Sequence, residues 1–346
     1  MKAPDETVHT YGFFLVPDFA LLPFASAVEA LRATNRLSGR RLYDWRLISK
    51  DGAPVASSSG VEARAEASIG DAGRLTDLIV VAGIGGELYR DREVFAWLRG
   101  LARGGCRIGA LSLGSYVLAR CGLLDGYRCT VHWENLAAFR EEFPDLDVTD
   151  EVYEIDRNRF TGSGGTAALD LMLSLIGAEQ GRDLAVRVAE SFIHERIRDN
   201  RDQQRMALRA RLGITHPKLL DAIALMEANQ ETVLSRAELA ERIGFSVRQL
   251  ERLFHGHLGR TPTRFYLDLR LERARRLLVQ TPMPVLGVAL ACGFVSASHF
   301  TKSYREFFGH TPTEERLPPK RPARTDEGGG PAPRRSRSAG GDQPTG

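Results

Sequence analysis

The sequence predicts two folded domains: an α/β domain with a doubly wound, flavodoxin-like parallel sheet, and an all-α domain with two helix-turn-helix units joined by a long helix. In the first half, short apolar runs that exit into glycine-rich loops alternate with helical stretches, as in parallel sheets. In the second half, one helical phrase occurs twice, which indicates a duplicated unit. The expected order is a first folded domain at residues 8–194, a helical linker at 195–216, a second folded domain at 217–317 and a disordered tail at 318–346.

The strands and helices of the first half are predicted from the hydrophobic pattern and from the prolines and glycines that interrupt it. Strands buried on both faces read as continuous apolar runs, and YGFFLV from Tyr11 is such a run. Pro17-Asp18 follows it as a loop, and later runs end in glycines that permit sharp strand exits. We expect strands at 11–16, 45–49, 78–81, 107–112 and 159–161, with helices at 25–37, 93–103, 114–121 and 167–176.

Net charge changes sign along the chain. Residues 1–194 carry a net charge of −6, and residues 195–346 carry +9. An acidic half joined to a basic half fits a regulatory or catalytic domain attached to one that binds a polyanion. Between them, His194 to Leu212 is rich in arginine and has no apolar stripe, so it is predicted to be a helical connector. From Pro318 onward, large apolar side chains are almost absent, which favours disorder.

The duplicated phrase has the form of a helix-turn-helix. The first copy reads LAERIGFS from Leu239, and the second reads VALACGFVS from Val288. Each copy continues with apolar residues four apart and ends in Gly-x-Thr-Pro. This pattern predicts a short helix, a glycine-centred turn and a longer helix with one apolar stripe. A plain helical bundle with solvated charges would not require the repeat.

The outward face of each longer helix is predicted to contact DNA. Arginine suits bidentate contact with guanine, glutamine with adenine, and glutamate can accept from the cytosine amine. The expected DNA-binding residues are Arg248, Gln249, Glu251 and Arg252 in the first copy and Ser298, His299, Lys302 and Arg305 in the second.

A long helix is predicted between the two copies. Thr261 is a suitable cap, Pro262 is suited to the first turn, and the helical pattern runs to Val279. Its length is roughly 27 Å at about 1.5 Å per residue. A rigid spacer of this size can hold two recognition helices about one DNA turn apart, near 34 Å. We therefore expect a bipartite site on double-stranded DNA.

A possible catalytic elbow lies at the end of the fourth predicted strand. The segment ALSLG from Ala110 has the small-x-nucleophile-x-small spacing of a strand-to-helix turn that exposes a strained nucleophile, here Ser112. Gly85 and Gly86 could supply backbone N–H groups, and His132, with Glu134 beside it, could act as a base. These residues alone allow an active serine amidase or peptidase with a DNA-binding appendage.

Both halves resemble known families. Residues 217–317, with ACGFVSASHF from Ala291 and FGHTP from Phe308, resemble the AraC/XylS family. Residues 11–190, with GSYVLA from Gly114 and TVHW from Thr130, resemble ThiJ/PfpI proteins of the class I glutamine amidotransferase-like fold. The fusion resembles GlxA-type regulators. The resemblance implies transcription regulation, most often activation, which would involve RNA polymerase, with the two recognition helices in successive major grooves.

The elbow departs from the enzymes of that fold. Their nucleophile is cysteine, where this chain has Ser112, and PfpI-type proteases place histidine where it has Leu113. The early segment 19–25, which would bring an acid near the nucleophile, is apolar. A serine without an adjacent base is a poor nucleophile. We therefore favour a catalytically inactive pocket that senses a ligand, formed at the carboxyl ends of the strands where loops 83–86 and 162–166 meet the elbow.

The resemblance also narrows the ligand. Similar regulators control arginine, carnitine and glycine betaine catabolism, which implies an amino-acid-like or quaternary-ammonium effector. Aromatic faces can hold such a cation, a carboxylate can balance it, and loop N–H groups can take its carboxylate. The candidate ligand-binding residues are Gly85, Gly86, Ser112, Tyr116, His132, Trp133 and Glu134. Alternatively, Tyr116 and Trp133 are core residues, and His132 and Glu134 only brace the elbow.

Other classes of site are not indicated. The four cysteines form no CxxC or Cys/His pattern, so we expect no zinc site, other metal or disulfide framework, and no cofactor motif is present. The polar N-terminus does not resemble a signal peptide, and the apolar stretch 11–31 is broken by prolines and acids. The expected protein is cytoplasmic, forms a homodimer and has no membrane contact. An architectural DNA-binding protein with an inert dimerisation domain remains a third interpretation.

Overall fold

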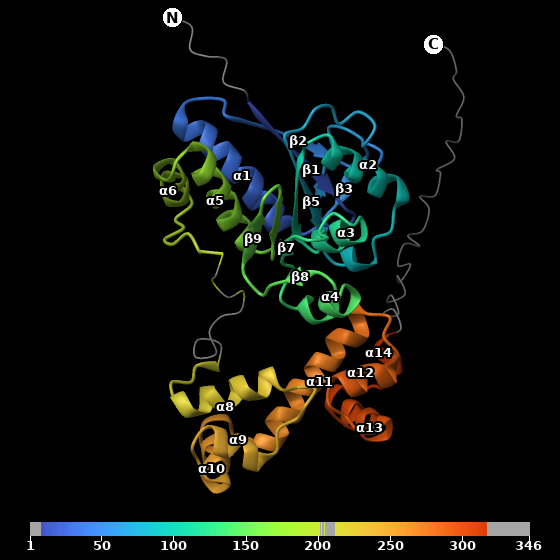
Figure 1. The fold of residues 1–346 in the computed structure, drawn as a ribbon, viewed down its shortest axis with the longest axis vertical. Coiled ribbons are helices and arrows are strands. Elements are labelled where there is room, and N and C mark those ends of the chain that lie inside the picture. Colours follow the sequence, from blue (N-terminus) through green and yellow to red (C-terminus); the bar gives the residue numbers. More distant parts are fainter. Residues whose placement is uncertain (1–7, 201, 203, 205–211, 317–346) are drawn as a thin grey trace, which may run out of the picture.

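The computed structural model describes residues 8–200, 202, 204 and 212–316. Its first domain contains a six-stranded sheet in the order β2-β1-β5-β6-β10-β9 (Figure 1). The strands pair in parallel except β9, which runs antiparallel to β10 at one edge. They are β1 (His9–Leu15), β2 (Tyr43–Ile48), β5 (Asp77–Ala82), β6 (Arg107–Ser112), β9 (Tyr153–Asp156) and β10 (Arg159–Gly162). The predicted doubly wound sheet is confirmed, with an added antiparallel edge.

Helices cover both faces of this sheet. One face packs against α1, α5 and α6, and the other packs against α2 and α3. Every residue of β5, in the middle of the sheet, is buried, which explains why its sequence is a continuous apolar run after Asp77. The helices are α1 (Leu21–Ser38), α2 (Arg92–Arg103), α3 (Gly114–Arg120), α5 (Ala167–Gln180) and α6 (Arg182–Ser191).

Short elements complete this domain. Two-residue strands form two small pairs, β3 (Val55–Ala56) with β4 (Glu62–Ala63) and β7 (Arg128–Cys129) with β8 (Asp147–Val148). A 3-10 turn, η1 (Gly86–Leu88), follows β5, and the short helix α4 (Leu136–Glu142) lies between β7 and β8. No sequence pattern had indicated α4, which lies at the lower end of the α/β domain and contacts α11 of the second domain (Figure 1).

The second domain is helical throughout its described part. Two apolar clusters lie in it, one around α8, α9 and α10 and the other around α11, α12 and α13. Each helix-turn-helix unit therefore has its own small core, and α11 connects them. The helices are α8 (Pro217–Ala228), α9 (Arg236–Arg242), α10 (Val247–Leu258), α11 (Pro262–Gln280), α12 (Val285–Ala291), α13 (Ala297–Phe308) and α14 (Pro312–Glu315).

Local sequence signals account for these helix boundaries. The side chains of Ser246 and Ser296 accept backbone N–H groups at the starts of α10 and α13, and Thr261 does the same for α11. Gly244 and Gly293 occupy the turns between the helices of the two units with φ of 72° and 71°, a region that disfavours other residues. The predicted short helix, turn and long helix are confirmed in both copies.

The connector differs from its prediction at its start, and residues 201, 203 and 205–211 lie outside the described ranges. Residues 194–200 follow α6 as non-helical chain, although a polar helix was expected from His194 onward. The reason is that this stretch is fixed by hydrogen bonds to the α/β domain: His194 and Arg198 both bind Asp170. The expected tail at 318–346 lies outside the described residues. Within the described ranges, no helix combines the length and apolar character needed to cross a membrane.

Candidate DNA-binding surface and effector pocket

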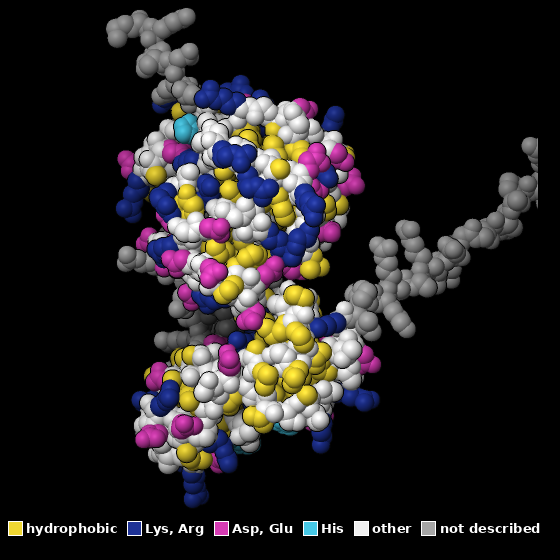
Figure 2. All heavy atoms as spheres, turned by 45° about the vertical axis from the view of Figure 1, so that its right-hand side comes forward, with side chains coloured by type: hydrophobic (Ala, Val, Ile, Leu, Met, Phe, Trp, Pro, Cys, Tyr) yellow, Lys and Arg dark blue, Asp and Glu magenta, His cyan; other side chains and the backbone are white. Residues whose placement is uncertain are grey.

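The recognition helix of the first unit, α10, presents two exposed arginines. Arg248 and Arg252 are exposed, while Leu250 and Phe254 are fully buried beneath them. Lys and Arg side chains project from the lower end of the molecule, at the height of α10 and α13 (Figures 1 and 2). A capped helix with an apolar underside and exposed arginines has the form that enters a major groove.

Two of the predicted base-reading residues in α10 already have partners. The side-chain oxygen of Gln249 accepts from the backbone N–H of Ser246, 2.8 Å away, and completes a capping box. The carboxylate of Glu251 pairs with Arg236 of α9, with N and O 2.6 Å apart. In this arrangement Gln249 sets the helix start and Glu251 braces the two helices of the unit. Base contact by either would require these interactions to break.

The second recognition helix, α13, has a similar division between buried and exposed faces. Phe300 and Tyr304 are fully buried. Its four predicted DNA-contacting residues, Ser298, His299, Lys302 and Arg305, are all exposed. All of them except His299 line a concave surface. Lys302 lies 4.0 Å from Glu306, an exposed pair that can exchange for phosphate at little cost.

The elbow at the end of β6 has the strained geometry that its sequence predicts. Ser112 has φ of 57° and only 8% of its surface is exposed. The chain turns so sharply there that a Cβ placed on Gly114 would lie 2.2 Å from the carbonyl oxygen of Val80. The predicted loops meet at this point: a Cβ on Gly164 would lie 3.0 Å from that of Ser112, and one on Gly86 would lie 3.0 Å from that of Leu113.

The elbow has no catalytic base in place. The Nδ1 atom of His132 accepts the backbone N–H of Glu134 at 3.4 Å, and among the described residues no hydrogen bond joins Ser112 to His132. Burial lowers the pKa of His132, and the nearby Glu134 carboxylate opposes this only in part. The imidazole is therefore neutral at pH 7 and turned toward its own loop. This geometry does not activate a serine hydroxyl.

Two of the candidate ligand-binding residues, Tyr116 and Trp133, make contacts away from the elbow. Tyr116 is fully buried, with its ring edge-to-face against Phe139 and its hydroxyl donating to the carbonyl of Asn135 at 3.5 Å. It belongs to the core, and its ring is closed to a ligand. Trp133 is half-buried and faces Arg276 of α11, whose guanidinium carbon lies 6.0 Å from the ring centroid. Gly85, Gly86 and Ser112 lie at the elbow. His132 and Glu134 contact each other, and the Glu134 charge also acts on Arg276 of α11.

A buried carboxylate in α5 was not identified from the sequence. Asp170, in α5, is fully buried, and its oxygens bind the ring of His194 and the backbone N–H and guanidinium of Arg198, each at 2.7–2.8 Å. Arg198 also donates to Thr166, in the loop after β10, at 2.8 Å. The available signal was an acid inside the otherwise apolar phrase AALDLMLSLI, because such a charge is buried only with partners.

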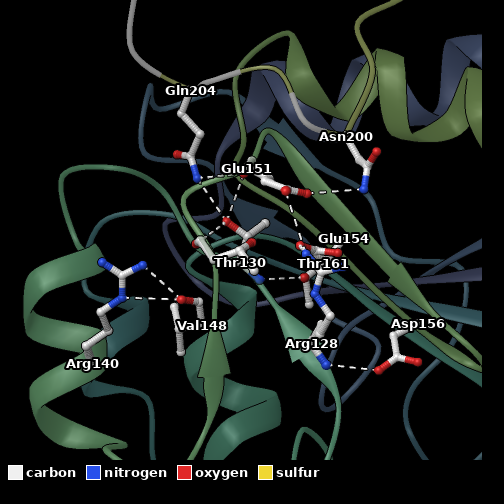
Figure 3. Close-up of polar contacts among 11 residues, drawn as sticks. Arg128, Thr130, Arg140, Val148, Glu151, Glu154, Asp156, Thr161, Asn200 and Gln204 are labelled. Atoms are coloured by element: carbon white, nitrogen blue, oxygen red, sulfur yellow. Dashed lines mark hydrogen bonds and ion pairs between the residues drawn. The ribbon is translucent and has the colours of Figure 1, made fainter.

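A second set of contacts fixes the connector near the elbow (Figure 3). The side-chain nitrogen of Gln204 lies within 3.0 Å of Thr130 Oγ1 and of the carbonyls of Val131 and Glu151. Asn200 donates to the Glu151 carboxylate at 3.1 Å. Thr130 and Val131 directly precede His132, and the Thr130 carbonyl accepts from Ser115 of α3, so the connector is attached to the segment that contacts the elbow helix.

Comparison with known proteins identifies the family. A DJ-1/PfpI family model matches residues 13–178, and a helix-turn-helix domain model matches residues 239–317. The chain is 50% identical over 305 residues to the HTH-type transcriptional regulator GbdR of Pseudomonas aeruginosa, which covers 88% of this chain and 83% of GbdR. It is 39% identical over 314 residues to the HTH-type transcriptional regulator GlxA of Rhizobium meliloti, and this match covers 90% of this chain and 96% of GlxA. The chain belongs to the GlxA-type transcriptional regulators.

A solved structure agrees with this assignment. An AraC family transcriptional regulator from Pseudomonas putida is 30% identical, with a TM-score of 0.50, and covers 53% of this chain and 99% of its own. The relatives that match over most of this chain are HTH-type regulators, which confirms the expected DNA-binding function. An enzyme, isonitrile hydratase of Pseudomonas putida, matches at 32% identity over 178 residues, or 50% of this chain. The hydrolase alternative is favoured neither by the regulators nor by the elbow geometry.

The elbow of this regulator leads to a direct chemical prediction. A fluorophosphonate probe, which labels activated serines, should give no adduct at Ser112, because no base polarises the hydroxyl. The measurement is mass spectrometry of the labelled full-length protein, with Ser112→Ala as the matched control. Ser112→Ala should also leave operator binding unchanged. A stoichiometric adduct on Ser112 that is absent from the variant would revive the hydrolase interpretation.

Proposed function

We propose that this regulator acts as a homodimer on a bipartite operator, where it contacts RNA polymerase and activates transcription from the cytoplasm. The DNA contacts would come from the exposed faces of α10 and α13. The carrying observation is that both helices are capped, backed by apolar cores and joined by the 19-residue helix α11. A helix of this length spans about 28 Å, so the units suit successive turns of one DNA face.

We further propose that a small zwitterionic metabolite, with an ammonium or quaternary-ammonium group, binds beside the Ser112 elbow and controls the affinity for DNA. The start of α3 and the backbone N–H of Gly85 would take its carboxylate. The N–H of Gly86 already donates to the carbonyl of Gly83 at 3.0 Å, so Gly86 would only let the ligand approach closely. The exposed carboxylate of Glu134 would attract its cation. Tyr116 has no part in this site, because its ring is enclosed in the core.

The test of the function is binding to an operator selected from random duplex DNA. The full-length protein should protect two half-sites on one face, with affinity that falls steeply as salt rises, because phosphate contacts release counterions. Arginine, carnitine and glycine betaine, added separately, should include one compound that raises the melting temperature and changes operator affinity. A protein that binds DNA but ignores all three would contradict the proposed effector class and leave DNA binding intact.

Arg252 is expected to read a base. Arg252→Ala should cost about 1–3 kcal/mol of binding free energy at particular base pairs, because a bidentate arginine contact to guanine is lost. Fluorescence anisotropy against single-base operator variants measures this discrimination. Arg242→Ala, which removes an exposed arginine from α9, is the charge-matched control and should weaken all sequences equally, if at all. Uniform weakening by Arg252→Ala would instead assign that residue to a phosphate.

A further inference from the structure

The α/β domain contributes a residue to the core of the second helix-turn-helix unit. Ala138, in α4, is 1% exposed and lies in the apolar cluster formed by α11, α12 and α13. Its cluster partners in α11 include Leu271, Ala274 and Leu277. The neighbouring residue Ala137 is exposed. The contact is therefore confined to one side of α4, and it falls on the helix that holds the two DNA-binding units together.

Polar and aromatic contacts extend this interface. The guanidinium of Arg276 lies over the face of Trp133, 6.0 Å from the ring centroid, in a cation–π arrangement. Burial lowers the pKa of Arg276, and the charges of Glu272 and Glu134 counter this effect. The guanidinium of Arg276 is thus partly shielded from water where it meets Trp133 of the α/β domain. Such desolvation makes the contact sensitive to small displacements.

The same segment is attached to the elbow helix. The hydroxyl of Ser115 in α3 donates to the carbonyl of Thr130 at 2.7 Å. The ring of Tyr116 packs edge-to-face on Phe139 with centroids 4.7 Å apart, and its hydroxyl reaches Asn135. Ser115 and Tyr116 follow Ser112 by three and four residues, so a shift of the elbow moves groups that directly contact residues 130–139.

The connector to the first unit is fixed to this segment as well. Gln204 binds Thr130 (Figure 3) and Val131. The carbonyl of Asp202 accepts the backbone N–H of Val152 at 3.1 Å. The chain beyond the connector leads to α8, in the core of the first unit. Residues 130–139 therefore contact the elbow helix α3, the connector and α11.

We propose that residues 130–139 form a coupling segment: an intramolecular docking surface, with α11 as its partner, through which the state of the elbow pocket sets the position of the DNA-binding domain. The inference rests on the proposed function for the identity of the signal. Coupling between two sites is reciprocal, so DNA bound to α10 and α13 must also change the coupling segment. That reciprocity allows a test with DNA alone, before any effector is known.

The test compares wild type with Ala138→Glu, Ala137→Glu and Arg276→Met by amide hydrogen exchange of the full-length protein. Each is measured with and without a duplex operator selected from random DNA. In Ala138→Glu a carboxylate enters the shared apolar core and should separate the domains, whereas Ala137→Glu places the same group in solvent. Melting curves check that every variant is folded.

Operator binding should change exchange protection of residues 132–142 in wild type and Ala137→Glu by a factor of roughly 5 to 150, the usual range of allosteric coupling. Ala138→Glu and Arg276→Met should still bind the operator but lose that change. Unchanged protection in wild type saturated with DNA would overturn the proposal, as would a wild-type response in Ala138→Glu. Neither outcome depends on the effector, so a failed metabolite screen would count against the proposed ligand only.

Discussion

Replacing Arg107 by alanine is expected to lower the free energy of unfolding of the α/β domain by about 3–5 kcal/mol. The Nε atom of Arg107 lies 2.5 Å from the carboxylate of Asp77, which is fully buried, and its guanidinium also pairs with Glu179 of α5. Truncation would leave a charge inside the sheet without its partner. The three tryptophans, Trp45, Trp97 and Trp133, all lie in this domain, so their fluorescence in urea measures the loss.

The pH dependence of this loss has a definite sign. Burial raises the pKa of Asp77 above its ordinary value, and Arg107 holds it down only in part. Without Arg107 the folded-state pKa rises further, so the folded form of the variant binds a proton that the unfolded form has released. The variant should lose stability as pH rises from the unfolded value through the folded pKa, and the deficit should shrink in acid.

Two further variants check the cause of the Arg107 effect. Arg103→Ala removes an exposed arginine of α2 and should change the free energy of unfolding by no more than about 0.5 kcal/mol. The double replacement Asp77→Leu with Arg107→Met should recover much of the loss, because an apolar pair needs no charge partner. A loss of less than about 1 kcal/mol in Arg107→Ala would contradict a dependence of the sheet on this ion pair.

The second large effect is expected at Phe300. Phe300→Ala should cost about 3–5 kcal/mol of stability in the second helix-turn-helix unit, because the ring is fully buried and leaves a cavity. The ring packs against Phe294 and Tyr304, with centroids 5.0 and 5.5 Å away, so α13 would lose contact with the turn before it. A loss of helical circular dichroism in urea that comes before the tryptophan transition measures this effect, because all three tryptophans lie in the α/β domain.

Phe300→Ala should also affect binding to the two half-sites of the operator differently. With α13 displaced, affinity for the full operator should fall to that for a single half-site, whereas binding of the half-site read by α10 should persist. Val295→Ala, at a residue that is 96% exposed just before α13, is the control and should leave both unchanged. Equal loss on both half-sites would mean that the units do not bind DNA separately.

Much of the helical domain could be predicted because its signals are local. Ser246 and Ser296 cap their helices through atoms three residues away, and Gly244 and Gly293 satisfy a backbone angle within a single turn. Such interactions need no distant partner, so the sequence pattern and the structure agree to within a residue or two there. The exposed faces of α10 and α13 follow from the same periodicity.

The pocket was predicted in outline only. Ser112 at a strained elbow and the convergence of three loops follow from glycine positions and from the rule that sites lie at strand carboxyl ends. The place of Tyr116 did not follow, because a tyrosine in α3 can face either the pocket or the core. The Tyr116 ring lies in the core because it packs against Phe139, which belongs to the helix α4 that no sequence pattern indicated.

The arginine-rich connector shows the limit of a compositional argument. Its polarity and lack of an apolar stripe predicted a solvated helix, but Asp170 and Glu151 offered buried or half-buried acceptors to Arg198 and Asn200. A side chain that gains a charge-assisted hydrogen bond to a buried carboxylate gains more than one that remains in water. The extended chain that makes those bonds is favoured over the helix.

By itself, the sequence determined the fold class of each half, the duplicated DNA-reading unit and the loss of a catalytic base beside Ser112. These rest on periodicity, caps, turns and residue identity, which act over a few positions of chain. Only the tertiary structure decided that Ala138 and Trp133 lie against α11, and that Gln204 reaches Thr130. Gln204 and Thr130 are 74 positions apart in the chain, and Trp133 and Arg276 are 143 apart. These contacts depend on which surfaces meet when the domains pack, and no local pattern records that.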